Sequence, residues 1–214
     1  ADASPEAAAA ANAADVLENT LYLEPLLRGH YPTLSHPDRR FASGLESAVK
    51  DGDLAVIATP VDFLGVNYYS RIFVDGYGQP LQTHRISSAG WQQIYPQGLR
   101  DVLTRLGRDY GSPEILITEN GIPDDVADSS NPMDDEARTV FLHQHLQAVH
   151  QAMGAGSRVK GYYAWSLLDN FEWTAGYSQR WGLVRVDFDT LARSPKASAA
   201  WYSATATSNS IPAE

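Results

Sequence analysis

The 214-residue sequence predicts an α/β fold in which a parallel sheet carries helices on its outer side. Three apolar segments have the pattern of strands buried on both faces, and they alternate with segments that carry apolar residues at helical spacing. Parallel strands need long crossover connections, which helices usually supply. The order strand, helix, strand, helix, strand, helix therefore indicates repeated βα units.

The N-terminal quarter predicts one helix, over residues 5–23. Pro5 and Glu6 suit a first turn, alanines follow, and the apolar side consists of Val16, Leu17, Leu21 and Leu23. Residues 24–54 are expected to be irregular, because prolines and glycines interrupt them repeatedly. No strand candidate occurs in residues 1–55.

The first predicted strand covers residues 62–69, and its apolar half runs into polar residues. A helix follows over 97–109, with a stripe of Leu99, Val102, Leu103 and Leu106. The second strand, from Ile115, ends in Glu119, after which Asn120 and Gly121 predict a sharp exit.

A second long helix is expected over residues 134–153. Acidic residues favour its positive N-terminus, Gly154 ends it, and its apolar stripe consists of Leu142, Leu146, Val149 and Met153. The third strand covers 159–165, a short helix covers 195–202, and residues 203–214 resemble a frayed polar tail. Since a closed (β/α)8 barrel needs eight strands and about 250 residues, we expect this chain to be part of one.

Composition excludes several function classes. The net charge of −10 argues against nucleic-acid binding, and without a run of 18 apolar residues we expect no membrane span. No signal-peptide pattern opens the chain and it has no cysteine, which is compatible with a cytoplasmic protein without disulfides or thiolate metal sites.

No metal or other cofactor is expected either. His143, His145 and His150 do not align on one helix face, and H-E-x-x-H is absent. The acidic residues between 124 and 136 lack the calcium-loop spacing, so we expect a solvated loop over the mouth of a site.

Glu119 is the strongest candidate for chemistry. A carboxylate at the end of a buried strand costs stability unless it is used or paired, and in parallel barrels the C-terminal strand ends carry the active site. Asn67 and Tyr69 share one face of the first strand, with Tyr68 on the other. A tyrosine hydroxyl beside a carboxylate can hold it ionised and oriented, as a nucleophile requires.

The third strand is followed by groups that suit sugar binding. Trp165 closes the strand, and Glu172 and Trp173 follow after a short loop. Indole faces stack on the C–H surface of a pyranose, while a carboxylate accepts hydrogen bonds from adjacent sugar hydroxyls. Core packing would be the usual reading of a single tryptophan, but this cluster at a strand end indicates a sugar cradle.

These segments resemble glycoside hydrolase family 1, the β-glucosidase type of (β/α)8 enzyme. Ile115–Gly121 is similar to its I-T-E-N-G signature, and the resemblance covers nearly the whole chain. Other matching segments are Leu26–Pro32, Asp62–Ser70, Trp91 to Leu99, Gly161–Trp173, Gly176–Asp187 and Arg193 to Tyr202.

The resemblance implies a role for each candidate residue. Glu119 becomes the nucleophile and Tyr69 its hydrogen-bond partner, with Asn67 nearby at the same mouth. Trp165 becomes the floor under the non-reducing sugar, and its outer hydroxyls are bound by Glu172 and Trp173. Trp181 stands where the family commonly has another aromatic residue, and it is carried over as an aromatic wall.

The same resemblance implies a neutral β-glycoside, for instance a β-glucoside, as substrate. Phospho-sugar members replace the region of Glu172 and Trp173 with groups that grip a phosphate, which a carboxylate would repel. Glucose, galactose and fucose remain open as the sugar, and the aglycone is open too.

A retaining glycosidase needs two carboxyl groups about 5–5.5 Å apart. In the family the second is the Glu of a T-x-N-E-P motif, which this chain lacks. Glu114 begins the nucleophile strand and so belongs at the opposite end of the barrel, and Glu172 is assigned to sugar binding. We therefore expect residues 1–214 to be a single partial domain, the C-terminal portion with strands six to eight.

The expected partner is a companion polypeptide that carries strands one to five and the acid/base, from a split gene or from cleavage. Two alternatives stay open: a non-catalytic sugar-binding remnant, and a thioglucosidase-type member that has lost the acid/base.

Overall fold

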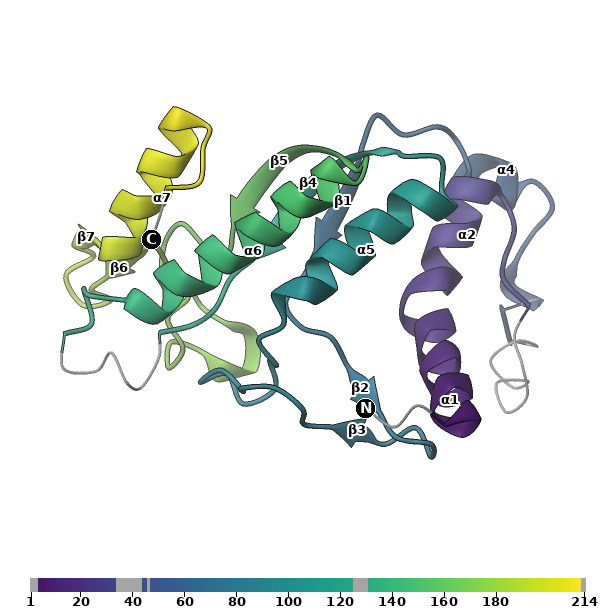
Figure 1. Ribbon diagram of the computed structural model, residues 1–214, viewed down its shortest axis with the longest axis horizontal. Coiled ribbons are helices and arrows are strands. Elements are labelled where there is room, and N and C mark those ends of the chain that lie inside the picture. The colour runs from purple at the N-terminus through teal and green to yellow at the C-terminus, as the bar shows by residue number, and fades with distance from the viewer. Residues whose placement is uncertain (1–3, 34–43, 46, 125–130, 213–214) are drawn as a thin grey trace. The chain divides into compact units, whose positions relative to one another are not determined.

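The chain forms two compact units in the computed structural model, which describes residues 4–33, 44–45, 47–124 and 131–212 (Figure 1). The first unit comprises Ala1–Asp62 and Ile72–Thr83, and the second comprises Phe63–Arg71 and His84–Glu214. Each unit is described separately below. Among the described residues, no helix has the length and apolarity needed to cross a membrane.

The first unit begins with the predicted helix, which is longer than expected. It runs as α1 (Pro5–Asp15), a π-helical turn η1 (Val16–Thr20) and α2 (Leu21–Arg28). The hydroxyl of Ser4 caps α1 by accepting the N–H of Ala7 at 3.1 Å. Gly29, with φ 73°, ends α2, because a residue without Cβ adopts this left-handed conformation readily.

The prediction of irregular structure over 24–54 is wrong at both ends. Helix α2 extends to Arg28 and α4 covers Asp53–Ile57, while residues 34–43 and 46 lie outside the described residues. The unit also contains an unpredicted antiparallel pair, β2 (Phe73–Val74) and β3 (Pro80–Leu81). Strands of two residues are too short to show an alternating pattern in sequence.

The second unit contains the three predicted strands in one parallel sheet. They are β1 (Leu64–Asn67), β4 (Glu114–Asn120) and β5 (Arg158–Ala164), in the order β1-β4-β5. The register shifts near the C-terminal ends, between Val66 and Asn67 and again between Ile117 and Asn120. Such irregularities re-aim side chains next to active sites.

Helices α5 (Pro96–Asp109) and α6 (Glu136–Gly154) lie side by side against the sheet (Figure 1). The predicted stripes hold in part, since Val102 is 37% exposed and Met153 is 48% exposed. On α6 the buried stripe includes smaller residues, which allow close helix packing. It runs through Phe141, His145, Ala148 and Ala152.

The opposite face of the sheet is open among the described residues. Thr118 and Lys160 are exposed on it, and Tyr163 is 57% exposed. Parallel sheets are normally covered on both faces.

The C-terminal region closes the ends of the strands. It comprises a 3-10 turn η3 (Trp173–Ala175), an antiparallel pair β6 (Val184–Val186) and β7 (Arg193–Pro195), and α7 (Ala197–Ser208). The predicted last helix is confirmed but begins two residues later and ends six residues later, so a frayed tail from residue 203 is wrong. Its packing against α6 builds a core of Ile122, Phe141, Leu142 and Leu183.

Candidate active site

Glu119 and Tyr69 form the centre of the site. The neighbouring parallel strands β1 and β4 end at the same edge, and there the Tyr69 hydroxyl donates a 2.7 Å hydrogen bond to Oε2 of Glu119. Burial raises the pKa of Tyr69 well above its usual value, and the hydrogen bond to Glu119 and that residue's charge raise it further. The phenol therefore stays protonated and acts as a fixed donor to the carboxylate.

Asn120, the residue after the candidate nucleophile, uses both polar atoms of its side-chain amide. The side chain is fully buried, with Nδ2 donating to the Tyr68 carbonyl at 2.6 Å and Oδ1 accepting from the Tyr162 hydroxyl at 2.5 Å. An amide offers a donor and an acceptor at once. Asn120 thereby links β4 to the strands on both sides of it and fixes the backbone beside Glu119.

Gly121 is required for close packing rather than for an unusual backbone angle. A Cβ at this position would lie 1.8 Å from the carbonyl oxygen of Trp165. The N–H of Trp165 donates to the Asn120 carbonyl at 2.9 Å, and the peptide between Trp165 and Ser166 is cis. Trp165 is thus held directly against the exit of the Glu119 strand.

An aromatic wall stands beside Tyr69. The Trp181 ring lies 5.7 Å from the Tyr69 ring in an edge-to-face arrangement, and Trp91 stacks on Trp181 at 6.5 Å. Trp181 is only 3% exposed, whereas Trp91 is 57% exposed. Trp91 was not among the predicted site residues. The only sequence signal for Trp91 was its place in the segment from Trp91 to Leu99 that resembles the family. Its ring contacts with Tyr69 and Trp181 could not be predicted, because they depend on the fold.

Glu172 and Trp173 lie on the loop after β5. Oε2 of Glu172 is buried without a hydrogen-bond partner among the described residues, and this carboxylate also contributes to the raised pKa of Tyr69. Trp173 has φ 46° and is 84% exposed. A buried, unpaired carboxylate oxygen next to an exposed indole is suited to a ligand that brings hydroxyl donors.

Asn67 does not hydrogen-bond Glu119 in this structure. Its Oδ1 accepts the hydroxyl of Thr118 at 2.6 Å, on the open face of the sheet. The side chain lies beside the residue that precedes Glu119 and remains exposed. Its predicted contact with substrate stays a prediction.

The prediction of a solvated acidic loop is wrong for Asp124 and Asp135. Oδ1 of Asp124 accepts from Arg138 at 2.5 Å and from Lys196 at 2.6 Å, and buried Asp135 pairs with Arg138. Asp135 also accepts the backbone N–H and the hydroxyl of Ser198, at the start of α7. Buried cations, which sequence could not place next to these acids, account for the difference. Residues 125–130 lie outside the described residues.

The ionic cluster extends to the loop that carries the sugar-binding candidates. Fully buried Lys196 also lies 3.6 Å from Asp169, which pairs with Arg180 at 2.8 Å. Burial and the charge of Arg138 lower the pKa of Lys196, and the two aspartates oppose this. We call Asp124, Asp135, Asp169, Arg138, Arg180 and Lys196 the ionic cluster. It joins the loop after β4 to the loop after β5.

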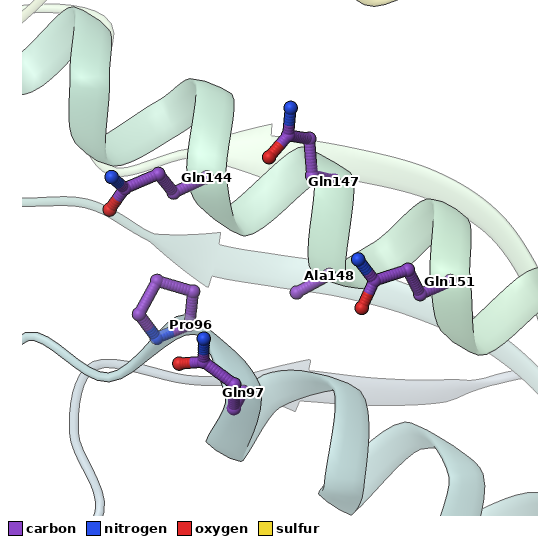
Figure 2. Close-up of a pocket in the computed structure, with 6 residues that line it drawn as sticks. All are labelled: Pro96, Gln97, Gln144, Gln147, Ala148 and Gln151. Atoms are coloured by element: carbon purple, nitrogen blue, oxygen red, sulfur yellow. The ribbon is translucent and has the colours of Figure 1, made fainter.

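Two other features bear on function. In the part of the chain that the structure describes, no group of three or more His, Asp or Glu residues could hold a metal ion. A pocket between α5 and α6 is lined by Gln97, Gln144, Gln147 and Gln151 with Pro96 and Ala148 (Figure 2). Because it contains no carboxylate and no aromatic ring, it has neither an acid nor a stacking surface for glycoside chemistry.

Comparisons with known proteins identify the family of this chain. A family model described as glycosyl hydrolase family 1 matches residues 1–211. β-Glucosidase A of Acetivibrio thermocellus is 40% identical over 192 residues, covering 85% of this chain and 42% of that protein. The 6-phospho-β-galactosidase of Staphylococcus aureus is 34% identical, covering 93% of this chain and 50% of that protein.

The fold is shared as well. The family 1 β-glucosidase from Thermotoga maritima superposes with a TM-score of 0.87 at 33% identity, covering 100% of this chain and 49% of that one. The chain thus spans about half the length of these relatives, and it matches their C-terminal half. The chain belongs to glycosyl hydrolase family 1 and forms part of that family's (β/α)8 barrel.

Proposed function

We propose that this chain is the nucleophile-bearing portion of a retaining β-glycosidase, with Glu119 as the nucleophile. The observation that carries the proposal is the 2.7 Å hydrogen bond from Tyr69 to Oε2 of Glu119 at the C-terminal ends of two neighbouring parallel strands. It orients the carboxylate, while Oε1 has no hydrogen bond among the described residues and is available for attack.

In this mechanism a carboxylate oxygen of Glu119 bonds to the anomeric carbon as the glycosidic bond breaks. The acid/base protonates the departing oxygen, then takes a proton from the water that releases the sugar from Glu119. Tyr69 stabilises the ionised carboxylate before attack.

The substrate class follows from the loop after β5. Glu172 presents a buried oxygen without a partner, and Trp173 presents a largely exposed indole. Neutral sugar hydroxyls satisfy such an oxygen, whereas a phosphate would be repelled by it. We therefore propose a neutral β-D-glycoside as substrate, even though one relative is a 6-phospho-β-galactosidase by name.

The second carboxyl group comes, in this proposal, from a companion segment that carries strands one to five. Glu114 begins β4, at the end opposite Glu119, and pairs with Arg158 at 2.5 Å. Within the described residues, β1 and β5 each pair only with β4, and one face of the sheet is open. A companion segment would cover that face, pair with both edges and deliver the proton donor.

Mechanism-based labelling tests the proposal. The chain is produced together with the N-terminal portion of the Acetivibrio thermocellus relative, and this pair is called the assembled enzyme below. After incubation with a 2-deoxy-2-fluoro-β-glucoside, we expect one added sugar on the peptide that contains Glu119. Glu119→Gln abolishes the label, and Glu114→Gln, on the same strand, retains it.

The alternatives give different results in the same experiment. A sugar-binding remnant binds glucose without acquiring a label, and that result would refute the proposed reaction. A thioglucosidase-type member acquires the label too, because in this pair the N-terminal portion of the relative supplies the acid/base. Reading the natural companion for T-x-N-E-P separates these two enzyme classes independently.

A further inference from the structure

Gln92 connects Tyr69, one member of the candidate nucleophile pair, to Gly121, which follows the other member by two residues. Its side chain is fully buried, and Nε2 donates to the carbonyl of Tyr69 at 3.0 Å and to the carbonyl of Gly121 at 2.7 Å. The first carbonyl belongs to the residue whose phenol holds Glu119. The second lies two residues beyond Glu119. One amide group thus spans the exits of β1 and β4.

This arrangement is costly for stability alone. The other side-chain atom, Oε1 of Gln92, is buried and has no hydrogen-bond partner among the described residues. An unsatisfied buried acceptor destabilises a fold, so a side chain kept only for packing would be better apolar. The two carbonyls that Nε2 satisfies are therefore the reason to examine Gln92 for a functional role.

The residues next to Gln92 are attached to the same place. The Trp91 ring lies 6.1 Å from the Tyr69 ring. The N–H of Gln93 donates to the Ser70 hydroxyl at 3.0 Å. These contacts hold residues 91–93 against the exit of β1. Gln92 in addition bonds the exit of β4.

We propose that Gln92 is a positioning residue, which sets the Tyr69 hydroxyl against Glu119 by fixing the Tyr69 and Gly121 backbones to one another. The role rests on the proposed function, because it matters only if Glu119 is the nucleophile. Asn120 supplies a similar link one residue earlier, at the Tyr68 carbonyl. Gln92 adds the second point of attachment, which removes the remaining rotation of the β1 exit.

The test compares Gln92→Met with Gln93→Met in the assembled enzyme. Gln93 is a good control because it is the same residue type, is 8% exposed, and accepts from the His84 backbone instead of bridging the strand exits. The measurement is labelling of Glu119 by the 2-deoxy-2-fluoro-β-glucoside at increasing concentration. It separates the limiting rate of attack from the half-saturating concentration.

For Gln92→Met we expect the limiting rate to fall about 10- to 100-fold, since small misplacements of reacting groups have effects of this size. The half-saturating concentration should change less than about threefold, because the sugar-binding loop is not altered. Gln93→Met should leave both values within about threefold. Equal effects of the two variants, or an effect of Gln92→Met on binding alone, would overturn the proposal.

Hydrogen exchange keeps the test independent of activity. The N–H of Tyr68 bonds the Glu119 carbonyl and that of Trp165 bonds the Asn120 carbonyl, each at 2.9 Å. We expect about tenfold faster exchange at both amides in Gln92→Met and no change in Gln93→Met. If the wild type is never labelled, the proposed function fails. If exchange at the Tyr68 and Trp165 amides is the same in Gln92→Met as in the wild type, the positioning role fails, whether or not the wild type is labelled.

Discussion

Truncation of Lys196 tests how the loops behind the site are held together. Lys196 is fully buried, bonds Asp124 at 2.6 Å and lies 3.6 Å from Asp169. Lys196→Met keeps the length of the side chain and removes the charge. Removing one partner of a buried ion pair costs about 3–5 kcal/mol, because the remaining charge loses its compensation.

The contacts left behind decide where in that range each variant falls. Without Lys196, Asp124 keeps Arg138, and Asp169 keeps Arg180 together with the N–H of Gly182. We therefore expect Lys196→Met to cost about 3 kcal/mol. Without Arg138, buried Asp135 has no cation left among the described residues, and Arg138→Met should cost about 5 kcal/mol.

Urea unfolding of the chain, followed by tryptophan fluorescence, measures both values. Arg158→Met is the matched control, because its pair with Glu114 is about half exposed and should contribute less than about 1 kcal/mol. The reasoning fails if Lys196→Met costs as much as Arg138→Met. It also fails if Lys196→Met costs no more than the control.

Three further predictions follow from single side chains. Burial lowers the pKa of His145 to about 4 in the folded chain, from the ordinary value of 6.5. Between pH 6.5 and pH 4 the imidazole is therefore protonated in the unfolded chain but still neutral in the folded chain. Unfolding free energy should therefore fall by about 3 kcal/mol as pH drops from 6.5 to 4. In urea titrations, His145→Leu removes this component and His150→Leu, on the same helix but exposed, does not. Tyr69→Phe should slow labelling of Glu119 about 10- to 100-fold, as expected for a lost hydrogen bond to a charged group, and an unchanged rate would contradict the assigned role. Trp173→Ala should raise KM for a β-glucoside about tenfold without changing Tm, because the ring is 84% exposed, whereas an equal fall in kcat alone would argue against sugar contact.

The elements that sequence predicted best are those with a long apolar pattern. Strand β4 and the helices α5 and α6 each bury such a pattern, whereas the buried residues of α7 are Ser198 and Thr205. The predicted stripes failed at Val102 and Met153, which are 37% and 48% exposed. The strands of two or three residues carry no period to detect.

The site divides in the same way. Glu119 and Tyr69 could be predicted because adjacent parallel strands bring their C-terminal ends together. Alternation within the strand predicted less, since Asn67 bonds Thr118. Gln92 and Lys196 could not be predicted, because neither lies on a strand of the parallel sheet and no strand pairing places their partners. Gln92 bonds a residue 29 positions away, and Lys196 bonds one 72 positions away.

Asp124 shows the limit of reading charge from sequence. An acidic run is most often solvated, and nothing in the local sequence distinguishes one of its members from another. The cations that pair with Asp124 are Arg138, on α6, and Lys196, the residue before α7. Local patterns therefore predict where a carboxylate begins a loop but not whether the fold supplies its counter-charge.

In the proposed mechanism the contacts that fix the nucleophile lie within this chain, which gives a chemical criterion for what the proposed companion adds. Every contact described here that fixes Glu119 comes from Tyr69, Asn120, Gln92 and their neighbours. Protonation of the leaving group is the proposed step to which no described residue is assigned. A β-glucoside with a dinitrophenolate leaving group needs no proton donor, whereas an alkyl glucoside does. We therefore expect the companion to accelerate cleavage of the alkyl glucoside much more than release of dinitrophenolate. An equal acceleration of both substrates would mean that the companion completes the sugar site or the fold, and that proton donation is not its distinctive contribution.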